Sequence, residues 1–103
     1  MRKVSVRVFR SDFALLSNTY NISGKIRQFV EECINERFTQ KFGLIEQTTE
    51  FTFKVEEDEY KLLEEYVKGV YNGTVSEFVR NCIHAKAHKL EYPVIRIEKI
   101  RLL

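Results

Sequence analysis

The sequence has no long apolar run and only two cysteines. No stretch approaches the roughly 18 apolar residues that a membrane span requires, and charged residues interrupt positions 1–7, where a signal peptide would be apolar. We therefore expect a cytoplasmic protein with no membrane partner. Two cysteines without an export signal do not indicate a disulfide framework, so Cys33 and Cys82 are expected to be reduced, buried thiols.

The sequence also lacks the side-chain patterns that catalysis requires. It has no nucleophile paired with a base, no carboxylate pair at a diagnostic spacing and no glycine-rich phosphate loop, so we expect neither an enzyme nor a small-molecule substrate. His84 and His88 share a helix face close to Cys82, but a zinc site needs about four ligands and no further cysteine or histidine lies nearby. We therefore expect no metal and no cofactor.

Composition and charge favour one folded domain with a mildly basic first half. Of the 103 residues, 44% are apolar and 31% are charged, a balance typical of globular proteins of this size. Residues 1–49 carry eight basic and five acidic side chains, whereas residues 50–90 carry six and eight. Because the net charge is only +2, a nucleic-acid interface depends on where these charges lie.

The second half of the chain repeats the pattern of the first. FVEECI at 29–34 returns as FVRNCI at 78–83, and a shift of 49 residues aligns apolar positions spaced by three and four, as on one helix face. A shift of 47 aligns apolar triplets that alternate with polar residues and predict strands: Val4, Val6 and Val8 with Phe51, Phe53 and Val55. The same shift predicts the first helix of each copy, through Phe13, Leu16 and Tyr20 and through Tyr60, Leu63 and Val67.

Capping residues predict where the second helices begin and end. Thr74 and Glu77 have the spacing of a capping box, which starts the last helix. In the first copy we expect Ser23 or Gly24 to cap the equivalent helix and Gly43 to end it.

These elements predict an α+β fold that is mainly helical. Since a lone strand cannot satisfy its backbone groups, the two strands are expected to pair in an antiparallel ribbon backed by four helices, a tandem pseudo-dimer. The first copy with its linker spans 1–49, the second spans 50–90, and a C-terminal extension with a β pattern spans 91–103. The change of shift from 47 to 49 predicts a two-residue insertion near 68–74.

The motifs VSVRV with NISGKIRQFV, and FTFKV with YNGTVSEFVR, resemble two ribbon-helix-helix motifs in tandem. The resemblance covers about residues 3–90. In this tandem form the chain is similar to fused regulators of archaeal viruses. It implies a sequence-specific transcription regulator that binds double-stranded DNA.

A two-stranded ribbon fits the major groove, where each base pair has a distinct pattern of donors and acceptors. By alternation, the polar residues that face away from the helices are the expected base readers: Lys3, Ser5, Arg7, Glu50, Thr52 and Lys54. The starts of the second helices offer amides and a helix dipole to backbone phosphate. The residues expected there are Ser23, Gly24, Lys25, Arg27, Asn72, Gly73, Thr74 and Ser76.

The C-terminal extension leaves two questions open. Residues 93–103 are expected either to pair with another chain, giving self-association, or to fold over the protein's own helices. The alternative function is an antitoxin-like or other protein-binding module that uses residues 91–103 to hold a partner.

Overall fold

The computed structural model describes residues 1–93, which form a small α+β domain with a two-stranded antiparallel sheet and four α-helices. This layout is compatible with a ribbon-helix-helix-like arrangement. In chain order the elements are β1 (Arg2–Phe9), α1 (Arg10–Ser17), α2 (Ile22–Asn35), β2 (Thr48–Val55), α3 (Glu57–Tyr66), the π-helical segment η1 (Val67–Tyr71) and α4 (Val75–Ala87).

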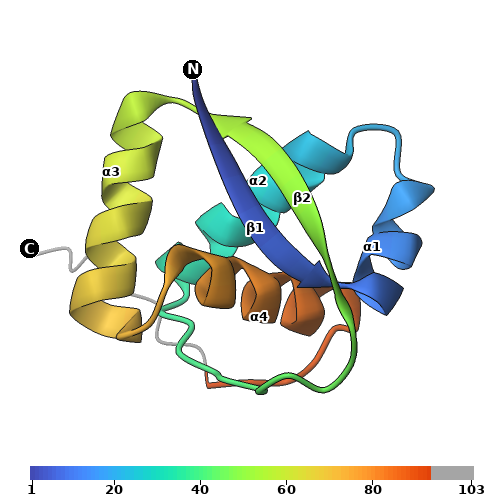
Figure 1. The fold of residues 1–103 in the computed structure, drawn as a ribbon. Helices are drawn as coiled ribbons and strands as arrows, with labels where there is room; N and C mark the ends of the chain where they lie inside the picture. Colours follow the sequence, from blue (N-terminus) through green and yellow to red (C-terminus); the bar gives the residue numbers. More distant parts are fainter. Residues whose placement is uncertain (94–103) are drawn as a thin grey trace, which may run out of the picture.

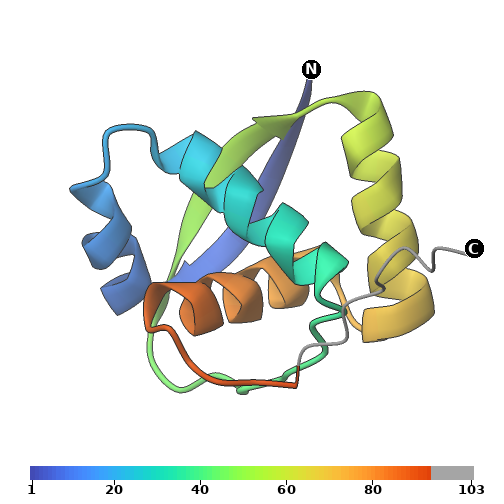
Figure 2. The ribbon, with the colours of Figure 1, turned by 180° about the vertical axis from the view of Figure 1, so that it is seen from behind.

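The ribbon forms one face of the domain, with the helices behind and beside it. Figure 1 shows β1 and β2 crossing the front without a helix over them, and Figure 2 shows α2 and α4 packed behind the strands. Helices α1 and α3 lie at opposite sides of the ribbon in both views. One face of the sheet is therefore buried and the other is open to solvent.

The alternating pattern of the strands predicted this burial correctly. Val4, Val6 and Val8 of β1 are buried, as are Phe53 and Val55 of β2. Half-buried Phe51 packs against the same core. Period-two alternation works here because only one face of the ribbon meets the helices.

The repeated helical stripes are also buried as predicted. Phe29, Val30 and Cys33 of α2 face their counterparts Phe78, Val79 and Cys82 of α4 in one continuous core. Apolar side chains from both halves of the chain thus contribute to one core, and fully burying a side chain of this kind stabilises the fold by about 1.5–3 kcal/mol.

Helix α2 ends earlier than the sequence predicted. It stops at Asn35, with Glu36 as its C-cap, and Gly43 lies in the linker with φ of +74° instead of ending the helix. Arg37 takes the left-handed conformation (φ 57°), and the Phe38 amide donates to the Cys33 carbonyl at 2.9 Å. This Schellman arrangement turns Phe38 into the core, where it is fully buried, and that burial offsets the strain of a non-glycine residue at positive φ.

The first helix of the first copy is likewise shorter than predicted. α1 ends at Ser17, so Tyr20 lies outside the helix and is fully exposed instead of continuing the apolar stripe of Phe13 and Leu16. In the second copy, α3 continues directly into η1, which occupies 67–71. The π-helical segment therefore falls where the insertion was predicted.

Cys33 of α2 and Cys82 of α4 form a disulfide, contrary to the expectation of two reduced thiols. Both residues are fully buried, and their Cα atoms lie 6.3 Å apart, within the range that a bridge requires. The expectation rested on the small number of cysteines and the lack of an export signal. Equivalent positions of the two copies meet where α2 and α4 pack together, which brings the two sulfur atoms within reach of each other.

None of the helices within residues 1–93 is long and apolar enough to cross a membrane. The β pattern expected of the C-terminal extension falls on residues 94–103, outside the described part of the chain, and so do all but the first of the residues 93–103 from which self-association is expected.

Candidate nucleic-acid interface

The six predicted base readers lie together on the open face of the ribbon. All are exposed, and the register pairs them in three rows across the two strands. Lys3 is opposite Lys54, Ser5 is opposite Thr52, and Arg7 is opposite Glu50. The structure therefore brings together every residue that the alternation assigned to this face.

The three rows differ in charge. The central row is neutral, and its two hydroxyl oxygens hydrogen-bond across the strands at 2.8 Å. One end of the ribbon carries the two like charges of Lys3 and Lys54, whereas the other end combines Arg7 with Glu50. Because directly opposed like charges destabilise a strand pair, the lysine row is unfavourable in isolation and suits an anionic partner.

Thr48 orients the Arg7 side chain on the open face. Arg7 Nε donates to Thr48 Oγ1 at 2.9 Å, and Arg7 Nη2 donates to the Thr48 carbonyl at 3.0 Å. These bonds occupy two of the five N–H groups of a guanidinium and leave the others for a ligand. Sequence reasoning missed Thr48 because it is the first residue of β2 and precedes the apolar triplet.

The start of α2 is capped by a residue that the sequence did not predict. Asn21, instead of Ser23 or Gly24, is the N-cap, and its Oδ1 accepts from the Gly24 amide at 3.0 Å. Asparagine is among the best N-cap residues, so its side chain takes precedence over the serine two positions later. A Cβ added to Gly24 would lie 2.6 Å from Asn21 Nδ2, so a larger residue here would displace the capping side chain.

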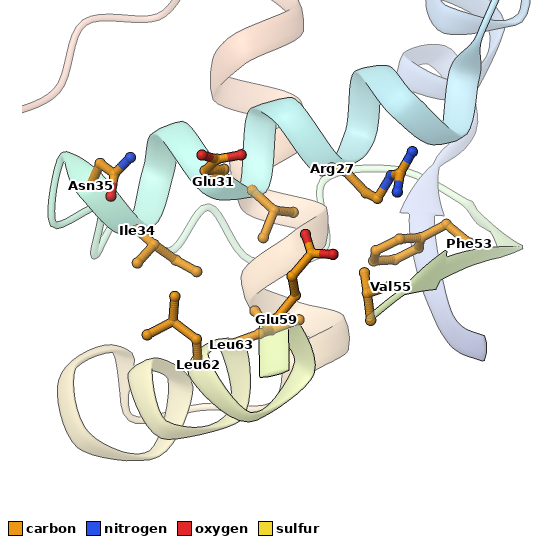
Figure 3. Close-up of a pocket in the computed structure, with 10 residues that line it drawn as sticks. Arg27, Glu31, Ile34, Asn35, Phe53, Val55, Glu59, Leu62 and Leu63 are labelled. Carbon is orange, nitrogen blue, oxygen red and sulfur yellow. The ribbon is translucent and has the colours of Figure 1, made fainter. Parts of the chain in front are cut away.

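The two basic residues of this helix start lie in different surroundings. Lys25 is half-buried, with Nζ 5.2 Å from the centre of the Phe29 ring. Arg27 lines an apolar pocket of about 220 Å³ between α2, α3 and β2, and its guanidinium points toward Phe53 (Figure 3). Its Nε is buried without a hydrogen-bond partner. Lys25 is thus the more accessible cation at this helix end.

The start of α4 follows the prediction in part. Thr74 is the N-cap, and its Oγ1 accepts from the Glu77 amide at 3.1 Å. The other half of the predicted capping box would join the Glu77 side chain to the Thr74 backbone amide. The Glu77 carboxylate instead lies 3.6 Å from Lys41 Nζ. Ser76 Oγ accepts from the Arg7 backbone amide at 2.9 Å, which fixes this helix start against the edge of β1.

Lys41 adds a charge that the repeat did not indicate. It comes from the linker, yet its Nζ donates to the Asn72 carbonyl at 2.9 Å and lies 4.9 Å from the Tyr71 ring centre. The turn at Asn72 and Gly73 therefore has a cation nearby, although its own two residues offer only amides. No local signal could identify Lys41, because 31 residues separate it from its partner.

The two helix starts lie on opposite edges of the ribbon. Figure 1 shows the start of α4 beside β1 and the start of α2 beside β2. The first-turn amides of a helix have no partner within the helix and attract anions with the help of the dipole. The arrangement can therefore hold an extended polyanion along both edges of the open face.

No family model, curated protein or solved structure matches this chain.

Proposed function

We propose that this protein is a sequence-specific, double-stranded DNA-binding regulator of the ribbon-helix-helix type, which inserts its two-stranded ribbon into the major groove. The observation that carries the proposal is the open face of the ribbon, with its three rows of exposed polar side chains. Arginine and lysine can donate to guanine O6 and N7, and the hydroxyls of serine and threonine can hydrogen-bond to more than one kind of base. A ribbon of this kind has the right width for the groove.

We further infer that residues 1–49 and 50–90 are tandem copies that form a pseudo-dimer within one chain. Two pairs of equivalent residues and one shared type of helix end support this inference. Ser5 and Thr52 bond at the centre of the ribbon, and Cys33 and Cys82 bond in the core. Left-handed residues follow the C-caps of both α2 and α4 and close the same type of Schellman turn.

The helix starts supply the phosphate contacts in this proposal. Lys25 would serve one DNA strand and Lys41, beside the turn before Thr74, would serve the other. Contacts of this kind position a protein on the duplex and make its affinity depend on salt, but they carry no sequence information. Specificity would come from the ribbon alone.

A selection from random duplex DNA tests the function. The full chain should enrich a defined motif, and affinity for that motif should fall steeply as salt rises, with a slope of about −0.9 per neutralised phosphate. Absence of enrichment, together with no duplex binding at low salt, would overturn the proposal and leave a protein-binding role.

Two substitutions test the division of labour between ribbon and helix starts. Arg7→Ala should cost about 1–3 kcal/mol on the selected site and much less on random duplex, because it removes a base contact. Lys25→Ala should weaken binding to all sequences alike and lower the salt slope by about 1. Lys61→Ala, on the exposed surface of α3, is the control and should change neither quantity. Equal losses on both duplexes for Arg7→Ala would exclude it from base reading.

A further inference from the structure

Three metal-ligating side chains meet beside the end of β1. Asp12 of α1 contacts His84 of α4 and His88, the C-cap of that helix: its Oδ2 lies 2.9 Å from His84 Nδ1, and its Oδ1 lies 2.6 Å from His88 Nε2. One ligand atom from each of the three residues falls within 4.8 Å of the others. The fold thus joins residues that are more than 70 positions apart in the chain.

The sequence predicted no metal here because the histidines lacked further ligands. His84 and His88 at i and i+4 project from one face of a helix, a spacing that suits a shared ion. Cys82 is excluded as a ligand because it belongs to the disulfide. Asp12 is the ligand that the fold supplies, and no periodicity in the sequence pointed to it.

The surroundings of the cluster restrict it to a small, positively charged ligand. The Asp12 side chain is fully buried, the His84 side chain is 14% exposed and the His88 side chain is 36% exposed. The rings of Phe9 and Phe42 pack edge-on against His84, with centroids 5.3 and 5.2 Å away. A buried carboxylate therefore lies behind two histidines, of which His88 is the more exposed.

We propose that Asp12, His84 and His88 bind a divalent transition-metal ion of the zinc class, with a water molecule as the fourth ligand. Zinc accepts imidazole nitrogen and carboxylate oxygen in tetrahedral sites, and three protein ligands with one water is a common set. With metal–ligand bonds of about 2.0–2.2 Å, the ligand atoms of a tetrahedral site lie roughly 3.4 Å apart. The distances from Asp12 to the two histidine nitrogens therefore need to increase by less than about 1 Å. His88, the most exposed of the three, can make that adjustment.

The bound ion would connect the two halves of the chain. Asp12 belongs to the first helix of the first half, whereas the histidines belong to the last helix of the second half and to its C-cap. The nearby Glu46 carboxylate is held elsewhere, since the Ser11 amide and hydroxyl donate to it at 2.8 and 2.7 Å. The ion therefore fixes α1 on α4 through three ligands only.

Titration of the full chain with Zn²⁺ and Co²⁺ tests this site. We expect one ion per chain, a visible absorption spectrum of four-coordinate Co²⁺, and perturbation of both histidine ring signals in NMR spectra. These signals are directly assignable to the site because the chain contains only two histidines. Binding should also raise the melting temperature by several degrees, since the ion binds the folded state.

His88→Gln and Glu46→Gln form the matched pair of variants. His88→Gln should weaken Zn²⁺ binding by at least about tenfold, the loss seen even for residues that only support a metal ligand. Glu46→Gln removes a neighbouring charge and should leave the affinity unchanged. Asp12→Asn should abolish binding, and circular dichroism will establish that the variant is folded. If His88→Gln binds Zn²⁺ as tightly as the unaltered chain, or if the unaltered chain binds none, the three residues form only an ion-paired cluster.

Discussion

Two buried phenols show how single polar groups hold the linker against the helices. Tyr66 Oη donates to the Phe38 carbonyl at 2.6 Å, and Tyr71 Oη donates to the Gln40 carbonyl at 2.8 Å. Asn81 Nδ2 in turn donates to Tyr71 Oη at 2.7 Å. Burial raises the pKa of both phenols, because it disfavours the charged form.

The raised pKa of Tyr66 predicts a loss of stability at high pH. Below about pH 10 the phenol is protonated in both states, and above that pH the unfolded chain releases its proton first, so the free energy of unfolding falls. Tyr66→Phe should lower the free energy of unfolding by about 1–3 kcal/mol at pH 8, because the Phe38 carbonyl is left without its buried donor. Between pH 8 and pH 11, the free energy of unfolding should then fall less for the variant than for the unaltered chain. Urea unfolding at both pH values measures the difference.

Tyr20→Phe is the control for this experiment, since Tyr20 is fully exposed. It should retain the pH dependence of the unaltered chain. Lys86, whose pKa is raised by hydrogen bonds to Tyr92, Glu36 and Glu32 despite its burial, contributes equally to all three proteins and cancels. An identical fall in stability for Tyr66→Phe would contradict the role assigned to its phenol.

At the scale of elements, the helix starts are fixed by single side chains. Asn21 caps α2 and Thr74 caps α4, so Asn21→Ala and Thr74→Ala should each lower the free energy of unfolding by about 1 kcal/mol. Ser23→Ala, two residues beyond the true cap, should change it by less than about 0.5 kcal/mol. Chemical denaturation of the three variants decides between Asn21 and Ser23 as the cap.

The strands and the buried stripes could be predicted from the sequence, whereas the ends of the helices could not. Val4 and Phe53 followed the two-residue period because one sheet face meets the core. The end of α2 depends instead on Phe38, whose burial forces Arg37 into a left-handed conformation, and this contact is tertiary. For the same reason the repeat could not reveal Lys41, Thr48 or Asp12, which reach their partners through the fold.

The disulfide between α2 and α4 should be a large single contribution to stability. For a sequence separation of 49, the chain-entropy model predicts that the free energy of unfolding is about 4 kcal/mol higher for the oxidised protein than for the reduced protein. Urea unfolding with and without reductant measures this difference. The Cys33→Ala/Cys82→Ala double variant should have the same free energy of unfolding in both conditions. Two thiols that react with an alkylating agent in urea without reductant would contradict the bridge.

At the scale of the whole molecule, the two ends of the ribbon are unequal although the chain repeats. The shift of 47 makes Arg7 equivalent to Lys54, but it makes Lys3 equivalent to Glu50. In the antiparallel register, these residues combine so that one end carries Lys3 with Lys54 and the other carries Arg7 with Glu50. A homodimer of identical chains would have two identical ends, so this polarity distinguishes the single-chain ribbon from a symmetric dimer.

The unequal ends predict an operator that is not palindromic. In the proposed complex, Glu50 would repel phosphate and accept hydrogen bonds only from base donors such as cytosine N4, whereas Lys3 would donate to guanine, so the two half-sites should differ in sequence. Glu50→Lys should shift the selected motif toward a palindrome and steepen the salt dependence of binding, because it makes the copies alike and adds a cation. Glu65→Lys, the same change of charge on the exposed surface of α3, should leave the motif as it is. Selection from random duplex with the three proteins provides the comparison, and a palindromic motif for the unaltered chain would show that Lys3 and Glu50 do not both contact bases.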